Sequence, residues 1–355
     1  MIGQRLLEFY LRSPGLTLII LGNALFITGA FFLAVGALLL RIRNDRKAGH
    51  WAELERRWEA TSVEVVTDIA PPEDVWQVVD PADRLRFLNF LLRFARRLTG
   101  AERRRVDDLA APYLELVLPQ LSSRSAERRA RAVQTLATLG SRRYARQVLA
   151  ALDDPAPLVA MVAARSLARH ESPDFAGPIL RRLPRFGHWR PSFLASMLAS
   201  IGPSVAPALR NALGNRRFEP LVRSVAAEAL RELNDYQAAD VAGQVLDETT
   251  DKDLIISTLG LLAHVGRADQ ADKIRRHLAA EEPIVRSRAI SALGRVGSRS
   301  EMPAVVAALD DPSPWVALRA AEALLEAHDP ALARIAASDH PRADLARQLL
   351  AGGGA

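Results

Sequence analysis

A period of about 31 residues runs through the chain from residue 121, and it constrains the fold more than any other feature of the sequence. Two series of leucines keep this period over seven copies each: Leu121, Leu152, Leu183, Leu213, Leu246, Leu278 and Leu309, and then Leu136, Leu167, Leu198, Leu230, Leu262, Leu293 and Leu324. The steps in both series lie between 30 and 33 residues. Two markers with one period indicate a repeat architecture whose units stack on their neighbours.

Each unit carries the signals of two helices joined by a turn. Asp-Asp-Pro follows the first leucine at Asp153–Pro155 and at Asp310–Pro312, where an Asp cap and a Pro in the first turn favour the start of a helix. Five units end on a residue that tolerates the left-handed backbone of a helix end: Gly140, Gly202, Asn234, Gly266 and Gly297. The sequence therefore predicts an all-α fold, an α-solenoid of about seven helix pairs over residues 121–330.

The repeat pattern resembles HEAT repeats, especially the short HEAT-like or phycobilisome-lyase-type variety. The segments that carry the resemblance are Leu278–Gly297, Leu309–Leu324 and Leu152–Leu167. The resemblance implies a solenoid whose second helices line the concave side, and it implies protein partners. Within the family, the chain is most similar to bacterial membrane-anchored proteins that contain a HEAT repeat domain.

Residues 15–40 contain no charged side chain. A helix of this length spans roughly 39 Å, which exceeds the hydrocarbon core of about 30 Å. Basic residues are more numerous after the segment than before it: Arg41, Arg43, Arg46 and Lys47 follow, and Arg5 and Arg12 precede. This bias predicts a single-pass protein of the inner (cytoplasmic) membrane, with a short N-terminal segment 1–14 outside and the repeats in the cytoplasm. A signal peptide, the alternative, would have a shorter apolar region and a small-residue cleavage site.

Small residues recur within this apolar segment. Gly15, Gly22, Gly29 and Gly36 are seven residues apart, and Asn23 lies beside them. Such a stripe permits close packing against another transmembrane helix, although glycine is also frequent in transmembrane helices in general. Gly22, Asn23, Gly29 and Gly36 are therefore candidates for helix packing in the membrane.

Residues 41–80 predict a juxtamembrane helix and a linker. Trp51, Leu54 and Trp58 share one helical face, which suits either a helix at the lipid headgroups or a continuation of the anchor helix, and we favour the continuation. The valines of 63–66 and the pair Pro71-Pro72 predict an extended linker with one short strand over 61–80.

Capping helices are expected at both ends of the repeats. In the N-terminal cap, 81–120, Asp80 and Pro81 open a first helix that Gly100 ends, and a second helix covers 102–121. The C-terminal cap and tail, 331–355, contain a helix over 342–350.

The sequence contains no motif for catalysis. The absence of cysteine excludes disulfides, thiolate zinc sites, iron–sulfur clusters and cysteine nucleophiles. Iron-dependent hydroxylases with HEAT-like repeats bind their metal through several His-Glu pairs, whereas this chain has one, His170-Glu171. We therefore expect no catalytic residue, no metal and no cofactor. A HEAT-like lyase-type enzyme is the alternative, although no pigment-binding apparatus is recognisable.

Charge is divided unevenly along the repeats. Residues 121–220 hold 16 basic and 6 acidic side chains, and residues 221–355 hold 15 and 20. Candidate partner-binding residues in the basic part are Arg128, Arg129, Arg131, Arg165, Arg169 and Arg190, with Trp189 from an aromatic turn.

These patterns predict a membrane-anchored scaffold or adaptor that binds proteins, an integral membrane protein among them. The alternative is an anionic-lipid or nucleic-acid binder that uses residues 121–220. Nucleic acid is disfavoured by the anchor and by an aromatic content of 6%.

Overall fold

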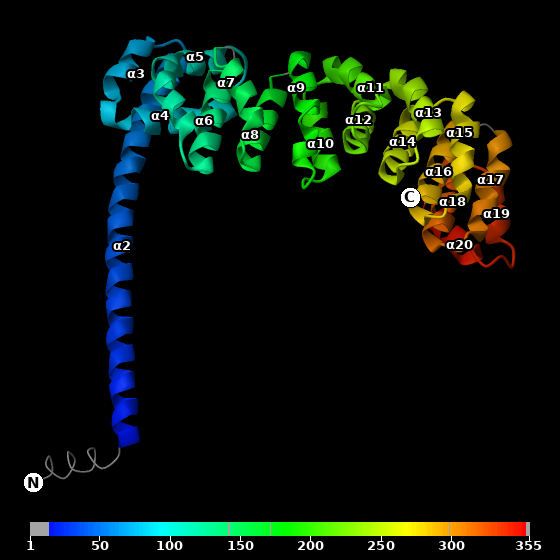
Figure 1. The fold of residues 1–355 in the computed structure, drawn as a ribbon, viewed down its shortest axis with the longest axis horizontal. Helices are drawn as coiled ribbons and strands as arrows, with labels where there is room; N and C mark the ends of the chain where they lie inside the picture. The colour runs from blue at the N-terminus through cyan, green and yellow to red at the C-terminus, as the bar shows by residue number, and fades with distance from the viewer. Residues whose placement is uncertain (1–13, 141–142, 171, 298, 353–355) are drawn as a thin grey trace, which may run out of the picture. The chain divides into compact units, whose positions relative to one another are not determined.

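The computed structural model of the protein describes residues 14–140, 143–170, 172–297 and 299–352 (Figure 1). The basic residues Arg5 and Arg12, most of the N-terminal segment, and the tail 353–355 lie outside these ranges. The chain divides into two compact units, Met1–Pro112 and Tyr113–Ala355, which we call unit 1 and unit 2. Each unit is described separately.

Unit 1 is built on one long helix, α2, which runs from Pro14 to Val66 without a break (Figure 1). Its segment Leu21–Arg41 is long and apolar enough to cross a membrane, and none of this segment is buried inside the protein. A signal sequence near the N-terminus can also meet these criteria of length and composition. The apolar segment and the first folded contacts of the chain therefore belong to a single continuous helix.

The last turns of α2 are the base of a small folded domain. Trp58 is 2% exposed, and its ring lies 5.5 Å from that of Phe87 and 6.0 Å from that of Phe90, on α4 (Arg84–Phe94). Val65 and Val66 are buried as well. The apolar helix thus continues through residues 41–66, as favoured from the sequence. The extended linker with a strand is not observed, because burial of these side chains in a helix outweighs their β propensity.

Two further helices close this domain. Helix α3 (Pro72–Val78) places the Trp76 Nε1 3.3 Å from the Leu109 carbonyl of α5 (Gly100–Ala110), to which it donates. Arg105 of α5 donates to the Val66 carbonyl at 2.6 Å and pairs with Asp68 at 2.8 Å. The end of α2 is therefore fixed by polar contacts as well as by its apolar core.

The predicted capping helices differ from expectation in two places: Gly100, expected to end the first helix, is the first residue of α5, and the second helix is not a single α-helix. Asp80 accepts a hydrogen bond from the Ala82 amide at 2.8 Å and begins the short 3-10 turn η1 (Pro81–Asp83), as expected. A second 3-10 turn, η2 (Ala95–Arg97), follows α4. The single helix expected over 102–121 is instead α5 followed by the 3-10 segment η3 (Ala111–Ser122). Pro112 and Pro119 lack the amide donors that a continuous α-helix needs.

Unit 2 is a row of helix pairs. We call the second helix of each pair a B helix and number repeats 1–7 by them: α6 (Ala126–Leu139), α8 (Pro157–Ala168), α10 (Pro191–Ala199), α12 (Pro220–Glu232), α14 (Lys252–Val265), α16 (Pro283–Val296) and α18 (Pro314–Glu326).

The first helices, which we call A helices, are shorter and several include 3-10 turns: η3, α7 (Ala145–Ala150), α9 (Ala176–Leu180), α11 (Ala206–Gly214), α13 (Ala239–Glu248), α15 (Ala271–Arg275) and α17 (Met302–Ala307). Helices α19 (Pro330–Ala336) and α20 (Ala343–Gly352) pack on α18 and on each other, where a C-terminal helix was expected.

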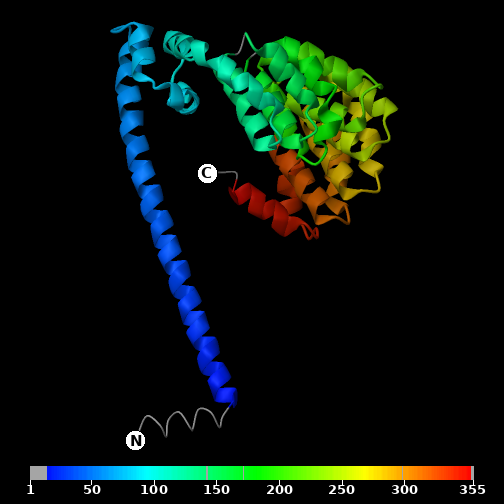
Figure 2. The same cartoon turned by 60° about the vertical axis from the view of Figure 1, so that its left-hand side comes forward.

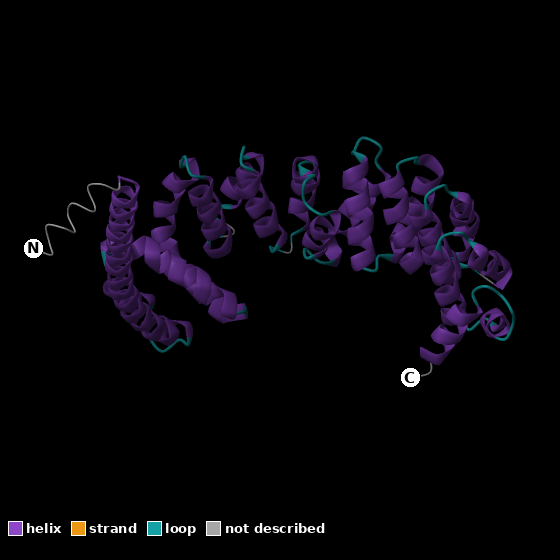
Figure 3. Ribbon diagram, turned by 90° about the horizontal axis from the view of Figure 1, so that it is seen from below, coloured by secondary structure: helices purple, strands orange, loops and turns teal. Residues whose placement is uncertain are grey.

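The B helices form the inner side of a curved row within unit 2 (Figure 1, Figure 2). All seven leucines of the second series have no exposed surface, as the core position of a repeat requires. Neighbouring B helices pack along their length, except that α8 and α10 barely touch. The described ranges contain helices and no strand (Figure 3), so the predicted all-α solenoid is confirmed.

Two different physical reasons explain the glycines and the asparagine at the ends of the B helices. Gly202 (φ 95°) and Asn234 (φ 51°) adopt the left-handed conformation, as expected. Gly266 and Gly297 have ordinary backbone angles, but a Cβ on either would lie 2.5 Å from the carbonyl oxygen of the preceding core leucine. The sequence therefore located the helix ends correctly, while close approach explains two of the glycines.

Candidate partner-binding surface

Three positions of every B helix form a continuous surface in unit 2, which we call the inner face. They lie five residues before, two residues before and two residues after the buried second-series leucine, so they share one side of the helix. In chain order they are Arg131, Gln134, Thr138, Val162, Arg165, Arg169, Phe193, Ser196, Ser200, Val225, Glu228, Glu232, Ser257, Gly260, His264, Arg288, Ser291, Arg295, Arg319, Glu322 and Glu326. The leucines on the opposite side pack into the core, and Val225, Ser257 and Gly260 are buried as well, so a partner of this face would contact its remaining residues.

Three of the predicted arginines lie together on the inner face. Arg131 on α6 and Arg165 and Arg169 on α8 are all exposed. The inner-face positions of these two helices include no acidic residue. Within the described ranges Arg131 and Arg165 form no ion pair, so their charges are available to a partner.

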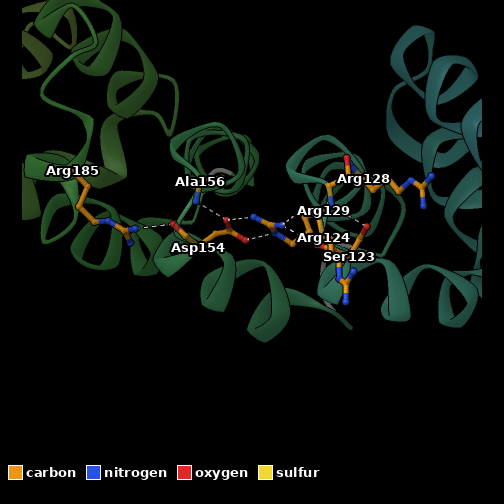
Figure 4. A network of polar contacts seen from close by, with 8 residues as sticks. Ser123, Arg124, Arg128, Arg129, Asp154, Ala156 and Arg185 are labelled. Atoms are coloured by element: carbon orange, nitrogen blue, oxygen red, sulfur yellow. Dashed lines mark hydrogen bonds and ion pairs between the residues drawn. The ribbon is translucent and has the colours of Figure 1, made fainter.

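The other candidates lie at the edges of this surface. Arg128 is exposed on α6 and points away from the neighbouring polar network (Figure 4). Arg190 is exposed directly before α10. Trp189 is half-buried because its ring stacks on Phe193 at 5.5 Å, and its Nε1 has no hydrogen-bond partner in the described part of the chain. The aromatic turn therefore contributes one ring to the face of repeat 3.

Arg129, by contrast, is structural, and its prediction as a partner-binding residue is wrong. Its Nε and Nη2 donate to the two carboxylate oxygens of Asp154, both at 2.8 Å, and its Nη1 donates to the Ser123 carbonyl at 2.8 Å (Figure 4). The side chain of Arg129 is only 15% exposed. It joins repeat 1 to the turn between α7 and α8 of repeat 2, and its charge is paired with Asp154.

Asp154 holds that turn as well as the arginine. Its Oδ1 accepts from the Ala156 amide at 2.8 Å, and α8 begins only at Pro157, so Asp154 fixes the turn before the helix and is not the N-cap itself. The hydrogen bond from Arg129 lowers the pKa of Asp154, against the effect of burial. Arg286 and Asp311 repeat the arrangement at 2.8 and 2.9 Å. We call these two pairs the Arg–Asp ties.

A third arginine occupies the same position without its partner. Arg223, like Arg129 and Arg286, lies seven residues before a second-series leucine, but Thr249 stands three residues before the next B helix, where the aspartate would be. The Thr249 hydroxyl accepts from the Asp251 amide at 3.2 Å, so the turn is kept while the charge is lost. Arg223 is 7% exposed, its Nη2 has no partner in the described ranges, and burial lowers its pKa.

Residues considered for chemistry are not clustered. Within the described ranges no group of three His, Asp or Glu side chains is placed to hold a metal ion. His170 lies just after α8 with its ring 6.1 Å from that of Phe175, and Glu171 lies outside the described residues.

The candidates for membrane packing are uncovered in unit 1. Asn23 is exposed, and no atom lies within 4 Å of where a Cβ on Gly22, Gly29 or Gly36 would be. Their role in helix packing stays a prediction.

Comparison with known proteins matches part of the repeat row to a family. A family model described as HEAT repeats matches residues 240–326 and 271–351. No curated protein matches the chain. Among solved structures, the karyopherin Kap121p bound to the extreme C-terminus of the phosphatase Cdc14p is 15% identical, with a TM-score of 0.42 and coverage of 72% of this chain and 35% of that one. The chain thus spans about a third of the karyopherin's length.

Two shorter proteins are also similar. The CpcE–CpcF complex of phycocyanin lyase from Nostoc sp. is 20% identical, with a TM-score of 0.33 and coverage of 65% of this chain and 83% of that one. Human deoxyhypusine hydroxylase is 17% identical, with a TM-score of 0.30 and coverage of 79% and 98%. The helix pairs from α6 onward share one arrangement, and those in residues 240–351 match the family model of HEAT repeats.

Proposed function

We propose that the protein is a membrane-anchored scaffold that binds a protein partner through the inner face of unit 2 and catalyses no reaction. The observation that carries this proposal is the exposure of Arg131 on α6 and Arg165 on α8, which form no ion pair among the residues that the structure describes. A concave row of exposed side chains with one sign of charge suits a partner of the opposite charge.

The anchor supports the location of this scaffold. We propose that Leu21–Arg41 spans the inner membrane, because Arg41 and Arg43 follow the apolar segment and place the repeats in the cytoplasm. Because α2 continues into the core around Trp58, the membrane segment and unit 1 are joined by helix. An integral membrane protein that also contacts Gly22 and Gly29 would be bound at a high effective concentration.

Charge reversal at the inner face tests the binding function. We expect the triple variant Arg128→Glu, Arg131→Glu and Arg165→Glu to lose about tenfold or more of the partner that wild type captures by crosslinking in intact membranes, because each exposed contact contributes modestly and the three act together. Capture is measured by mass spectrometry of the crosslinked complexes. The matched control is Arg347→Glu, an exposed arginine of α20 outside the inner face, which should retain wild-type capture.

Removal of the anchor tests the location. A variant that lacks residues 1–41 should move from the membrane pellet to the soluble fraction and capture less partner, because the effective concentration falls. Capture by the triple variant equal to that of wild type would refute the basic inner face as the binding surface. A truncated protein that still sediments with membranes would refute the span.

A further inference from the structure

Two large apolar side chains are exposed at the same position of the last two repeats. Ile284 is 47% exposed and Trp315 is 73% exposed, and each is the second residue of its B helix, directly after a proline. Neighbouring apolar side chains that contact water are typical of binding surfaces. Tryptophan in particular supplies a large share of the binding energy at protein interfaces.

An arginine lies one helical turn beyond each of them. Arg288 follows Ile284 by four residues and Arg319 follows Trp315 by four, so each apolar side chain and its arginine share one side of the helix. Arg319 bonds Glu322 on its own helix at 2.5 Å. Arg288 forms no ion pair in the described ranges. Both repeats therefore present the same apolar and basic pair.

The charge around Arg288 is unbalanced. Burial lowers the pKa of Arg288, and the nearby Arg231 of α12 and Arg319 of α18 lower it further. Glu228 is the nearby acidic group that opposes this effect, and burial raises the pKa of Glu228 in turn. Arg288 therefore lies near two other arginines, Arg231 and Arg319, with Glu228 as the opposing charge, and an added carboxylate would relieve the repulsion among the arginines.

The distance between repeats 6 and 7 matches a ligand in an extended conformation. Helices α16 and α18 pack side by side, and the axes of packed helices are about 8–10 Å apart. An extended chain advances about 3.3 Å per residue, so three residues cover one repeat. A segment that carries an apolar and an acidic residue in every three would match both pairs in succession.

We propose that repeats 6 and 7 bind an extended acidic segment of a protein partner, with carboxylates on Arg288 and Arg319 and apolar side chains on Ile284 and Trp315. The proposal rests on the scaffold function and adds a second contact to it, distant in sequence from the basic surface of repeats 1 and 2. A continuous polyanion fits less well, because Glu322 and Glu326 lie on the same face.

Peptide binding to the full-length protein in detergent tests the proposal. The probe is a fluorescein-labelled peptide in which Gly-Leu-Glu is repeated, measured by fluorescence anisotropy. Trp315→Ala, and separately the pair Arg288→Glu and Arg319→Glu, should weaken binding by about tenfold or more, as expected for anchor residues of an interface. The matched control is Leu158→Ala on α8, which has the same position and is also 47% exposed, but is followed four residues later by Val162. It should bind like wild type.

Several outcomes would overturn the proposal. These are no binding to the wild-type protein, equal binding of a Gly-Leu-Lys peptide, an equal loss in Leu158→Ala, or unchanged binding in the Trp315 and arginine variants. Binding of a DNA oligonucleotide or of vesicles with anionic lipid that depends on the same arginines would assign the site to another ligand. The crosslinking experiment on Arg128, Arg131 and Arg165 does not use these repeats, so the scaffold function can stand when this proposal fails.

Discussion

Gly294→Leu should detach the last repeat from the rest of the solenoid. A Cβ at Gly294 on α16 would lie 2.6 Å from the Cβ of Ala323 on α18, a separation that real side chains essentially never show. Both helices would have to move apart, and their contact buries Leu293 and Leu324. Overpacking in a core costs about 1–3 kcal/mol for added methylenes, and with the lost contact between repeats we expect more than about 3 kcal/mol.

Hydrogen exchange measured by mass spectrometry would locate this effect. Exchange should accelerate over residues 302–352, from α17 to the end of α20, while the earlier repeats keep their protection, because repeats couple only to their neighbours. The control is Gly260→Ala on α14, where nothing lies within 4 Å of the new Cβ. Alanine there should stabilise the protein by about 0.5–1 kcal/mol through helix propensity. Wild-type exchange in Gly294→Leu would show that α16 and α18 tolerate separation.

The repeat itself was predictable from the sequence because its signals are local and occur many times. Leucines at the helix ends, prolines at the helix starts and glycines after them define each pair. Where one repeat lacks a signal, the other six repeats still show the pattern. The same redundancy explains why repeat 3, which contains the aromatic turn with Trp189, did not disturb the prediction. Phe186 of this repeat is buried.

Contacts between neighbouring repeats were harder to predict. Arg129 looks like its exposed neighbour Arg128 in the sequence, and only the fold brings Asp154, 25 residues away, against it. One signal was present, since Arg286 and Asp311 show the same spacing of 25 residues. The valines at the end of α2 were misassigned for a similar reason, because their core is formed by helices that come later in the chain.

The exposed apolar residues at the start of the B helices were missed altogether. Leu158, Ile284 and Trp315 fit the apolar pattern of a helix, and periodicity does not distinguish a buried apolar residue from one at the open edge of a B helix. The structure separates them by exposure: the second-series leucines are covered, whereas Trp315 is 73% exposed.

Asp311→Ala should be the second most damaging substitution, because it breaks an Arg–Asp tie. Asp311 accepts two hydrogen bonds from Arg286 and one from the Ser313 amide at 2.8 Å, and its side chain is 11% exposed. Its removal leaves Arg286 with backbone carbonyls alone and releases the turn before α18. Hydrogen bonds to charged groups contribute about 1.5–3 kcal/mol, and we expect a loss in this range for the free energy of unfolding.

The loss should depend on pH with a definite sign. The hydrogen bond from Arg286 lowers the pKa of Asp311 in the folded protein. The stabilisation is therefore complete above the unfolded value of about 3.9 and disappears as the pH falls through the lower folded value. Urea unfolding should separate Asp311→Ala from wild type at pH 7, and the difference should shrink below about pH 4. A difference that grows on acidification would contradict the tie.

Two comparisons isolate the tie from a general effect of charge. Asp310 is the adjacent aspartate, with a side chain 72% exposed, and Asp310→Ala should change stability by less than about 0.5 kcal/mol. Thr249→Asp should act in the opposite direction, because it places a carboxylate where the two ties have theirs and gives Nη2 of the buried Arg223 a partner, and a gain of about 1 kcal/mol is expected from one charged hydrogen bond. If Thr249→Asp destabilises the protein, Arg223 is held by something other than a missing tie, and the equivalence of the three arginines fails.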